Sequence, residues 1–157
     1  MSALVPHGIG GQNGEVDDAE AVIERSHLAL GEFFKGDPAP ALELFSRRED
    51  VTLGNPFGPF VRGWERVSET AARAATYYRD GEAVGFERVA TYTTGDLACF
   101  VEVERYRVKV GGSDEVTPVA LRVTSVVRRE DDGWRIVSRH ADPITAARAP
   151  DSVIQPG

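Results

Sequence analysis

The amino-acid sequence predicts an α+β fold, in which helices from the first half of the chain pack against a curved sheet formed by the second half. Apolar residues recur at helical spacing up to about Gly81, and after it Val, Thr, Tyr and Phe dominate in segments separated by glycine-containing breaks. Helices followed by strands are typical of the α+β class. The 157 residues have room for one domain, expected at 17–145 between a flexible arm (1–16) and a tail (146–157).

Three helices are expected before Gly81. The first runs from Asp17, as its N-cap, to Gly36, and apolar residues recur along it at Val22, Ile23, Leu30, Phe33 and Phe34. A short second helix follows Asp37-Pro38, because a cap residue before a proline is a common helix start. The third covers residues 64–78.

The strands are expected in two groups. A short strand at 51–53 runs into the turn-rich segment 54–59, where Pro and Gly forbid regular pairing, so this segment should form a loop at an opening. Longer strands joined by short turns then form an antiparallel meander, at residues 84–94, 97–110, 116–129 and 134–142.

Strand alternation predicts which side chains point inward. The odd positions are the more apolar set along 97–105 and again along 121–128. We therefore expect an apolar cavity, with Asn55 near its mouth, lined by Val101, Val103, Leu121, Val123 and Ser125. The last strand stays ambiguous, because its two faces are equally mixed: Val137, Arg139 and Ala141 against Trp134, Ile136, Ser138 and His140.

Composition narrows the possible partners. The net charge is −7, and the basic residues are interleaved with acids, so nucleic acid is not expected as a partner. No segment resembles a signal peptide or a membrane span, and the single Cys99 lies in an apolar run as a reduced, buried thiol, which predicts a cytoplasmic protein without a membrane partner. No metal-ligand spacing or phosphate-binding glycine loop occurs, so neither a metal nor a cofactor is expected.

Several short motifs resemble ketosteroid isomerase: Gly36-Asp37, Asn55-Pro56-Phe57-Gly58, Gly63 and Ala120-Leu121. Over roughly residues 22–142 the order of elements resembles the nuclear transport factor 2-like, or ketosteroid isomerase-like, superfamily. The resemblance implies three N-terminal helices packed in a strongly curved, mostly antiparallel sheet, a cone-shaped α+β barrel with a cavity. SnoaL-type polyketide cyclases share this fold. The hairpin 128–140 also resembles one in the association domains of calmodulin-dependent kinases, so the fold admits enzymes and non-enzymes.

The same resemblance implies that ketosteroid isomerisation is lost. In that enzyme an aspartate before Pro-Phe-Gly moves a proton, while a tyrosine and a protonated aspartate stabilise the oxyanion. The matching positions here hold Asn55, Ala29 and Ser125. An amide cannot accept and return a proton near neutral pH. Asn55 and Ser125 could orient a carbonyl or hydroxyl, or they could only shape a turn and fit a tight core.

The candidate pocket residues combine the predicted lining with nearby aromatic and basic groups. Arg105 and Arg139 would favour a carboxylate-bearing ligand, unless they reach solvent or pair with an acid. Trp64, Tyr77 and Tyr78 could add to an aromatic wall or belong to the core. The ligand-binding candidates are Phe45, Asn55, Phe57, Val101, Val103, Arg105, Val123, Ser125 and Arg139.

Three functions remain open at this point: a small-molecule-binding domain without ketosteroid isomerisation, a cofactor-free isomerase, cyclase or dehydratase, and a non-catalytic dimeric interaction domain. His140 and Asp142 are the candidates for an acid–base pair at the rim, so whether the chain is an enzyme stays undecided. The expected partners are a small apolar or carboxylate-bearing molecule and a second copy of the chain. Homodimerisation is expected because short turns would align Glu104, Arg122 and His140 in a polar row on the outer sheet face.

Overall fold

The computed structural model describes residues 6–157, with side chains described from Asp18 onward. Within this part of the chain there are three α-helices and six strands, in the predicted α+β order. The helices are α1 (Pro6–Phe33), α2 (Ala39–Leu42) and α3 (Trp64–Ala75). The strands are β1 (Thr52–Gly54), β2 (Val61–Arg62), β3 (Tyr78–Thr94), β4 (Leu97–Val110), β5 (Thr117–Glu130) and β6 (Gly133–Asp142).

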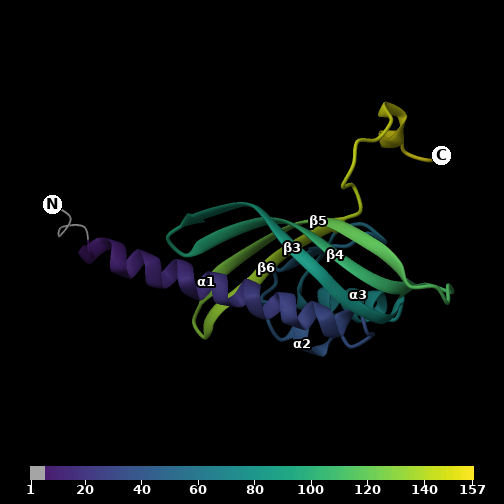
Figure 1. The fold of residues 1–157 in the computed structure, drawn as a ribbon. Coiled ribbons are helices and arrows are strands. Elements are labelled where there is room, and N and C mark those ends of the chain that lie inside the picture. The colour runs from purple at the N-terminus through teal and green to yellow at the C-terminus, as the bar shows by residue number, and fades with distance from the viewer. Residues whose placement is uncertain (1–5) are drawn as a thin grey trace.

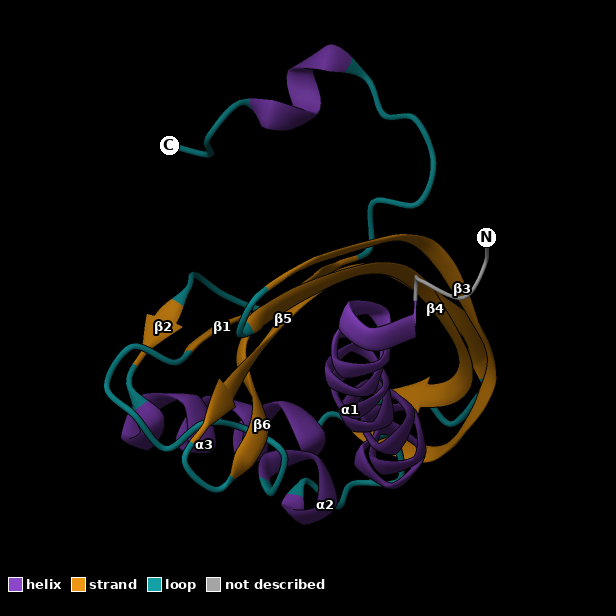
Figure 2. Cartoon of the chain, turned by 90° about the vertical axis from the view of Figure 1, so that its left-hand side faces the viewer, coloured by secondary structure: helices purple, strands orange, loops and turns teal. Residues whose placement is uncertain are grey.

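The strands form one curved, mixed sheet in the order β2-β1-β6-β5-β4-β3. The meander from β3 to β6 is antiparallel, as predicted, while β1 lies parallel to β6. The sheet curves strongly but stays open, because β2 and β3 are edge strands (Figure 2). Strand β2 was not predicted, since two residues are too few to show an alternating pattern.

Helix α1 lies along the concave side of the sheet, and α2 and α3 lie near the C-terminal half of α1 (Figures 1 and 2). The predicted start at Asp17 was wrong, because the helix begins at Pro6. The predicted flexible arm is therefore helical from Pro6 on, and residues 1–5 lie outside the described residues. The glycine-rich stretch between residues 8 and 14 disfavours helix, which explains why the sequence indicated none there.

The core between α1 and the sheet consists of two clusters of buried apolar residues. One joins α1 to α3, β1 and the ends of β4–β6, around residues such as Ile23, Val67 and Phe100. The other joins the end of α1 to β3, β4 and β5, where the ring of Phe34 stacks on Tyr106 with centroids 3.8 Å apart. None of the helices within residues 6–157 is long and apolar enough to span a membrane.

The inward face of β4 is opposite to the prediction. Its even positions are buried, and they include Phe100, Glu102, Glu104 and Tyr106. The register explains the difference, since Glu104 pairs with Leu121 and not with Arg122. On β5 the odd positions are buried, as predicted. The prediction treated polar side chains as outward-facing. It failed for β4 because the two acids of this strand are buried and paired with residues from other elements.

The chain beyond β6 leaves the domain on the convex side of the sheet (Figure 2). It ends in a single 3-10 turn, Pro150–Val153. Val153 and Ile154 are largely exposed in this tail. The tail therefore adds no side chain to the concave face, where α1 lies.

Candidate functional site

A cavity opens between the three helices and the concave face of the sheet. It encloses about 700 Å³ when the space at its open mouth is included. Its walls are mostly apolar and come from α1, α2, α3, the 54–59 loop and four strands, β1, β3, β5 and β6. The lining residues are Ser26, Leu30, Phe33, Phe34, Ala41, Leu42, Phe45, Leu53, Asn55, Pro56, Phe57, Ala71, Ala74, Tyr78, Leu121, Ile136, Arg139 and Ala141.

The loop after β1 holds Asn55 and Phe57 at this cavity. The Oδ1 atom of Asn55 accepts a hydrogen bond from the backbone N–H of Phe57 at 2.9 Å, the local turn that asparagine favours. The ring of Phe57 packs against Tyr77 and Tyr78, with centroids 5.0 and 5.8 Å away. Asn55 therefore shapes the turn, and its side-chain amide makes no other hydrogen bond within the described residues.

Tyr78 is the main open hydrogen-bonding group of the cavity. The residue is only 5% exposed, yet its hydroxyl makes no hydrogen bond within the described part of the chain. No fully buried side-chain oxygen or nitrogen among the described residues lacks a partner, so this hydroxyl is not completely enclosed, and Tyr78 lines the cavity. Burial raises the pKa of Tyr78 to about 12. The hydroxyl therefore keeps its proton near neutral pH and can donate it in a hydrogen bond.

Arg139 brings a charge to the cavity wall, but that charge is paired. Its two terminal nitrogens donate to the carboxylate of Glu104 at 2.9 and 2.8 Å, and the Tyr106 hydroxyl donates to the same carboxylate at 2.7 Å. Glu104 is 1% exposed. Burial works against the charge of Arg139, but the Glu104 carboxylate outweighs it and raises the pKa of the guanidinium. Burial and the Glu104 charge together raise the pKa of Tyr106 well above its usual value.

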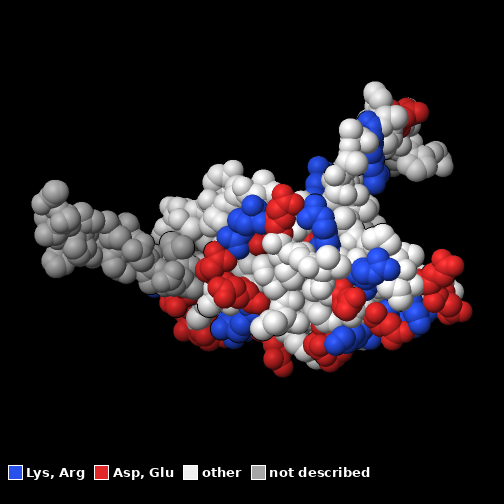
Figure 3. All heavy atoms as spheres, viewed as in Figure 1, with Lys and Arg blue, Asp and Glu red and all other residues white. Residues whose placement is uncertain are grey.

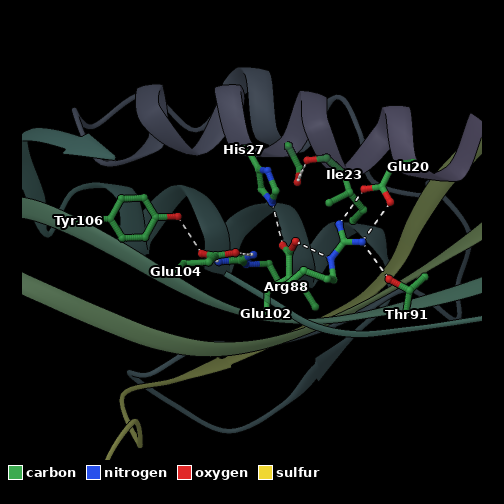
Figure 4. A network of polar contacts seen from close by, with 10 residues as sticks. Glu20, Ile23, His27, Arg88, Thr91, Glu102, Glu104 and Tyr106 are labelled. Carbon is green, nitrogen blue, oxygen red and sulfur yellow. Dashed lines mark hydrogen bonds and ion pairs between the residues drawn. The ribbon is translucent and has the colours of Figure 1, made fainter. Parts of the chain in front are cut away.

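A second buried acid, Glu102, lies one inward position away on the same strand (Figure 4). His27 from α1 reaches Glu102 at 2.7 Å, and Arg88 from β3 donates to it at 2.9 Å. Arg88 also forms two hydrogen bonds with Glu20. Burial alone would raise the pKa of Glu102, but the hydrogen bonds from His27 and Arg88 lower it. This network ties α1 to the sheet and has no member on the cavity wall.

Both buried acids were missed by the sequence analysis. Glu102 and Glu104 alternate along the strand with Val101 and Val103. In this pattern the two acids look like the outer, solvent-facing side of the strand and the two valines like the inner side. The charged partners are remote in the sequence, because Arg88 lies 14 residues from Glu102 and Arg139 lies 35 residues from Glu104. The even positions also hold Phe100, Tyr106 and Val108, and this longer apolar run was the signal that could have reversed the assignment.

The predicted pocket residues divide into three groups. Phe45, Asn55, Phe57 and Arg139 line the cavity. Val123 and Ser125 are buried on the inner face of β5 without reaching the lining. The placement of Val101, Val103 and Arg105 was wrong, because these residues lie on the convex face; Arg105 is exposed and pairs with Glu87 at 3.0 Å.

The predicted outer row of Glu104, Arg122 and His140 was also wrong. Glu104 is buried on the inner face, and Arg122 lies opposite Asp142, with which it forms a 2.8 Å ion pair. His140 is half exposed, packs near the ring of Phe60 and lies 3.6 Å from Asp142. The His140–Asp142 pair is therefore absent from the cavity lining, and the hydrogen bond from Arg122 lowers the pKa of Asp142 against the effect of burial.

Among the side chains that the structure describes, no three His, Cys, Asp or Glu residues gather as metal ligands would. Cys99 is half-buried on the convex face rather than buried, and this partial burial raises the pKa of its thiol. The cavity's own polar groups are an amide, two hydroxyls and a paired guanidinium, from Asn55, Ser26, Tyr78 and Arg139. Ser26 is already bonded to the Ile23 carbonyl oxygen at 2.7 Å.

The sequence profile of the SnoaL-like domain family matches residues 30–145, which include β1 to β6 and most of the cavity lining. The chain belongs to the SnoaL-like domain family. This membership agrees with the curved sheet around a helix and with the resemblance drawn from the short motifs. A search of curated proteins found no match to the chain.

Solved structures similar to this SnoaL-like domain share its fold at low sequence identity. A ketosteroid isomerase-like protein from Erwinia carotovora atroseptica has 19% identity and a TM-score of 0.70, covering 85% of this chain and 99% of that one. A provisionally named dehydratase of the nuclear transport factor 2-like family from Streptomyces avermitilis has 23% identity and a TM-score of 0.64, covering 83% and 98%. A provisionally named calcium/calmodulin-dependent protein kinase type II association domain from Thiobacillus denitrificans has 22% identity and a TM-score of 0.62, and the match covers 79% of this chain and 93% of that one.

Proposed function

We propose that this SnoaL-like domain binds a small, largely apolar molecule that carries a carbonyl or hydroxyl oxygen. The observation that carries the proposal is the hydroxyl of Tyr78, a residue that lines this mostly apolar cavity, because that hydroxyl has no partner within the described residues. A mostly apolar cavity with a few polar groups on its wall is the usual form of a small-molecule site. The side-chain N–H groups of Asn55, which also lines the cavity and makes no hydrogen bond through them within the described residues, add a second donor.

The polar groups of the cavity favour orienting a ligand over moving its protons. Tyr78 keeps its proton at neutral pH, Asn55 is an amide, and the charged Arg139 is paired with the Glu104 carboxylate. None of the three is a general base near neutral pH. We therefore propose a binding domain without ketosteroid isomerisation. An isomerase, cyclase or dehydratase remains the alternative, and it is supported by the names of two similar structures, the ketosteroid isomerase-like protein and the provisionally named dehydratase.

The test compares two neutral probes of similar size, acetylnaphthalene and ethylnaphthalene, by calorimetric titration. The wild-type chain should bind the ketone more tightly, by about tenfold, because one hydrogen bond to a buried hydroxyl contributes on the order of 1 kcal/mol or more. Tyr78→Phe should remove this preference and leave ethylnaphthalene binding unchanged. The control is Tyr92→Phe, which alters an exposed tyrosine at the far end of β3. Equal affinity of the wild type and Tyr78→Phe for the ketone would contradict the proposal.

We also propose that the domain pairs with a second copy through the convex sheet face. The centre of that face holds half-buried apolar residues, Cys99, Val101, Val103 and Val126, and the exposed apolar tail leaves on the same side. One similar structure is named as an association domain, which supports self-association in this fold. Acidic and basic side chains are interspersed over the face drawn in Figure 3, which favours neither nucleic acid nor a membrane as partner. A cytoplasmic location remains part of the proposal.

A further inference from the structure

We propose that Glu104 determines the charge of the ligand: by holding Arg139 in a bidentate ion pair, it makes the cavity accept neutral molecules and reject carboxylates. This inference rests on the proposed small-molecule binding and names the ligand class that the site selects. Arg139 is the only arginine or lysine among the described residues that line the cavity. Its state of pairing therefore decides whether the cavity presents a net positive charge.

The geometry of the pair leaves little of that charge for a ligand. Both terminal nitrogens of Arg139 donate to Glu104, at 2.9 and 2.8 Å, in the parallel arrangement that suits a guanidinium and a carboxylate. The side chains of Arg139 and Glu104 are only 13% and 2% exposed. Water screens their attraction weakly at this depth, so separating them would be costly.

Glu104 is itself held in place by a third group. The hydroxyl of Tyr106 donates to Glu104 at 2.7 Å, and the Tyr106 ring is stacked on Phe34 in the core. The carboxylate therefore cannot swing away from Arg139 without leaving the tyrosine hydroxyl buried and unpaired. A ligand carboxylate would have to share one guanidinium with Glu104, in a site where two negative charges repel strongly.

A neutral oxygen meets no such obstacle. A ketone at the same place can accept a hydrogen bond from Tyr78 and keep the Arg139–Glu104 pair intact. The neighbouring acid on the strand, Glu102, has its own partners, His27 and Arg88, and none of these three lines the cavity. Glu104 and Glu102 thus form a natural pair of test and control, since both are buried acids on the inner face of β4.

The experiment measures the affinity of acetylnaphthalene and of naphthoate, which share one ring system and differ in charge, by calorimetric titration near neutral pH. The wild type should prefer the neutral ketone by at least about tenfold, because a carboxylate must be desolvated without a free cation. Glu104→Gln should gain naphthoate affinity by about tenfold or more, since the amide can still accept a hydrogen bond from Arg139 but no longer neutralises it. Glu102→Gln should keep the wild-type preference.

The double variant Glu104→Gln with Arg139→Gln should bind the ketone and show no gain for naphthoate. Circular dichroism shows which variants fold, and if Glu104→Gln does not, the preference of the wild type between the two probes still tests the inference. A wild type that binds naphthoate as tightly as the ketone would overturn the inference while leaving small-molecule binding intact. A wild type that binds neither probe would overturn the proposed function, and the inference with it.

Discussion

At the scale of single residues, the site depends on how each polar group is paired. Tyr78 and Tyr106 are both buried tyrosines of the same cluster, but only Tyr106 has a hydrogen-bond partner within the described residues. The side-chain oxygen of Asn55 accepts a hydrogen bond within the turn, and its side-chain N–H groups make no hydrogen bond within the described residues. Identical residue types thus take structural and ligand-facing roles according to their partners, which a sequence alone does not reveal.

The amide of Asn55 should prevent ketosteroid isomerisation. We expect no turnover of a β,γ-unsaturated ketosteroid by the wild type above the solution rate, measured by absorbance. Asn55→Asp keeps an oxygen to accept the Phe57 N–H and adds a base, so it should give a trace of activity, below the roughly 10²–10⁴-fold that a well-placed general base contributes. Clear turnover by the wild type would show that another group acts as the base.

The ionised form of Glu102 should stabilise the fold above the acid range. Its folded pKa is lowered, so its contribution is present above an unfolded pKa of about 4.3 and is lost as the pH falls through the folded value. Glu102→Gln should cost roughly 3–5 kcal/mol at neutral pH, because it breaks a buried charge network. In urea unfolding, the difference from the wild type should shrink as the pH falls below about 4.

The matched control for Glu102 is Glu87→Gln, which alters an exposed acid paired with Arg105. Exposed pairs contribute about 0–1 kcal/mol, so this variant should stay close to the wild type at every pH. A constant difference between the wild type and Glu102→Gln across the acid range would mean that the carboxylate charge is not what stabilises the network.

At the scale of elements, the fold depends on how closely β3 approaches the end of α1. The N–H of Gly81 donates to the carbonyl oxygen of Phe34 at 3.1 Å, and a Cβ at Gly81 would lie 2.6 Å from that oxygen. This contact places Tyr78, at the start of β3, beside Phe34 at the cavity. The glycine that marks the change from helical to strand periodicity in the sequence is therefore also a packing contact.

Replacing Gly81 by alanine should destabilise the domain by about 1–3 kcal/mol, because the methyl group would push β3 from α1. Urea unfolding measures the change. Gly85→Ala is the matched control on the same strand, since a Cβ there meets nothing within 4 Å. The control should change stability by less than about 1 kcal/mol, and equal losses in the two variants would argue against the contact.

At the scale of the whole molecule, the curved sheet separates two surfaces. Its concave face holds α1, the buried acids and the cavity, and its convex face carries an apolar centre and the departing tail (Figures 1 and 2). One face thus suits a small ligand and the other a protein partner. The polar row once expected on the convex face does not exist, so the dimer proposal now depends on apolar contact.

Light scattering should give a mass twice that of one chain. Val101→Glu should convert the protein to monomers, because it would bury an unpaired charge at the centre of the interface. The control is Leu28→Glu, which places the same charge on an exposed position of α1 away from the convex face. A monomeric wild type, or a dimer that survives Val101→Glu, would count against this interface.

The sequence by itself determined the α+β class, the antiparallel meander and the inward face of β5, because helical and alternating periods are local properties. It also indicated Phe45, Asn55, Phe57 and Arg139 as pocket candidates, and these four residues line the cavity, although it did not determine the inward face of the last strand. Only the tertiary structure decided the face of β4, since its buried acids are balanced by residues that are remote in the chain. The same is true of the open Tyr78 hydroxyl and the paired Arg139, because partners are set by packing between elements.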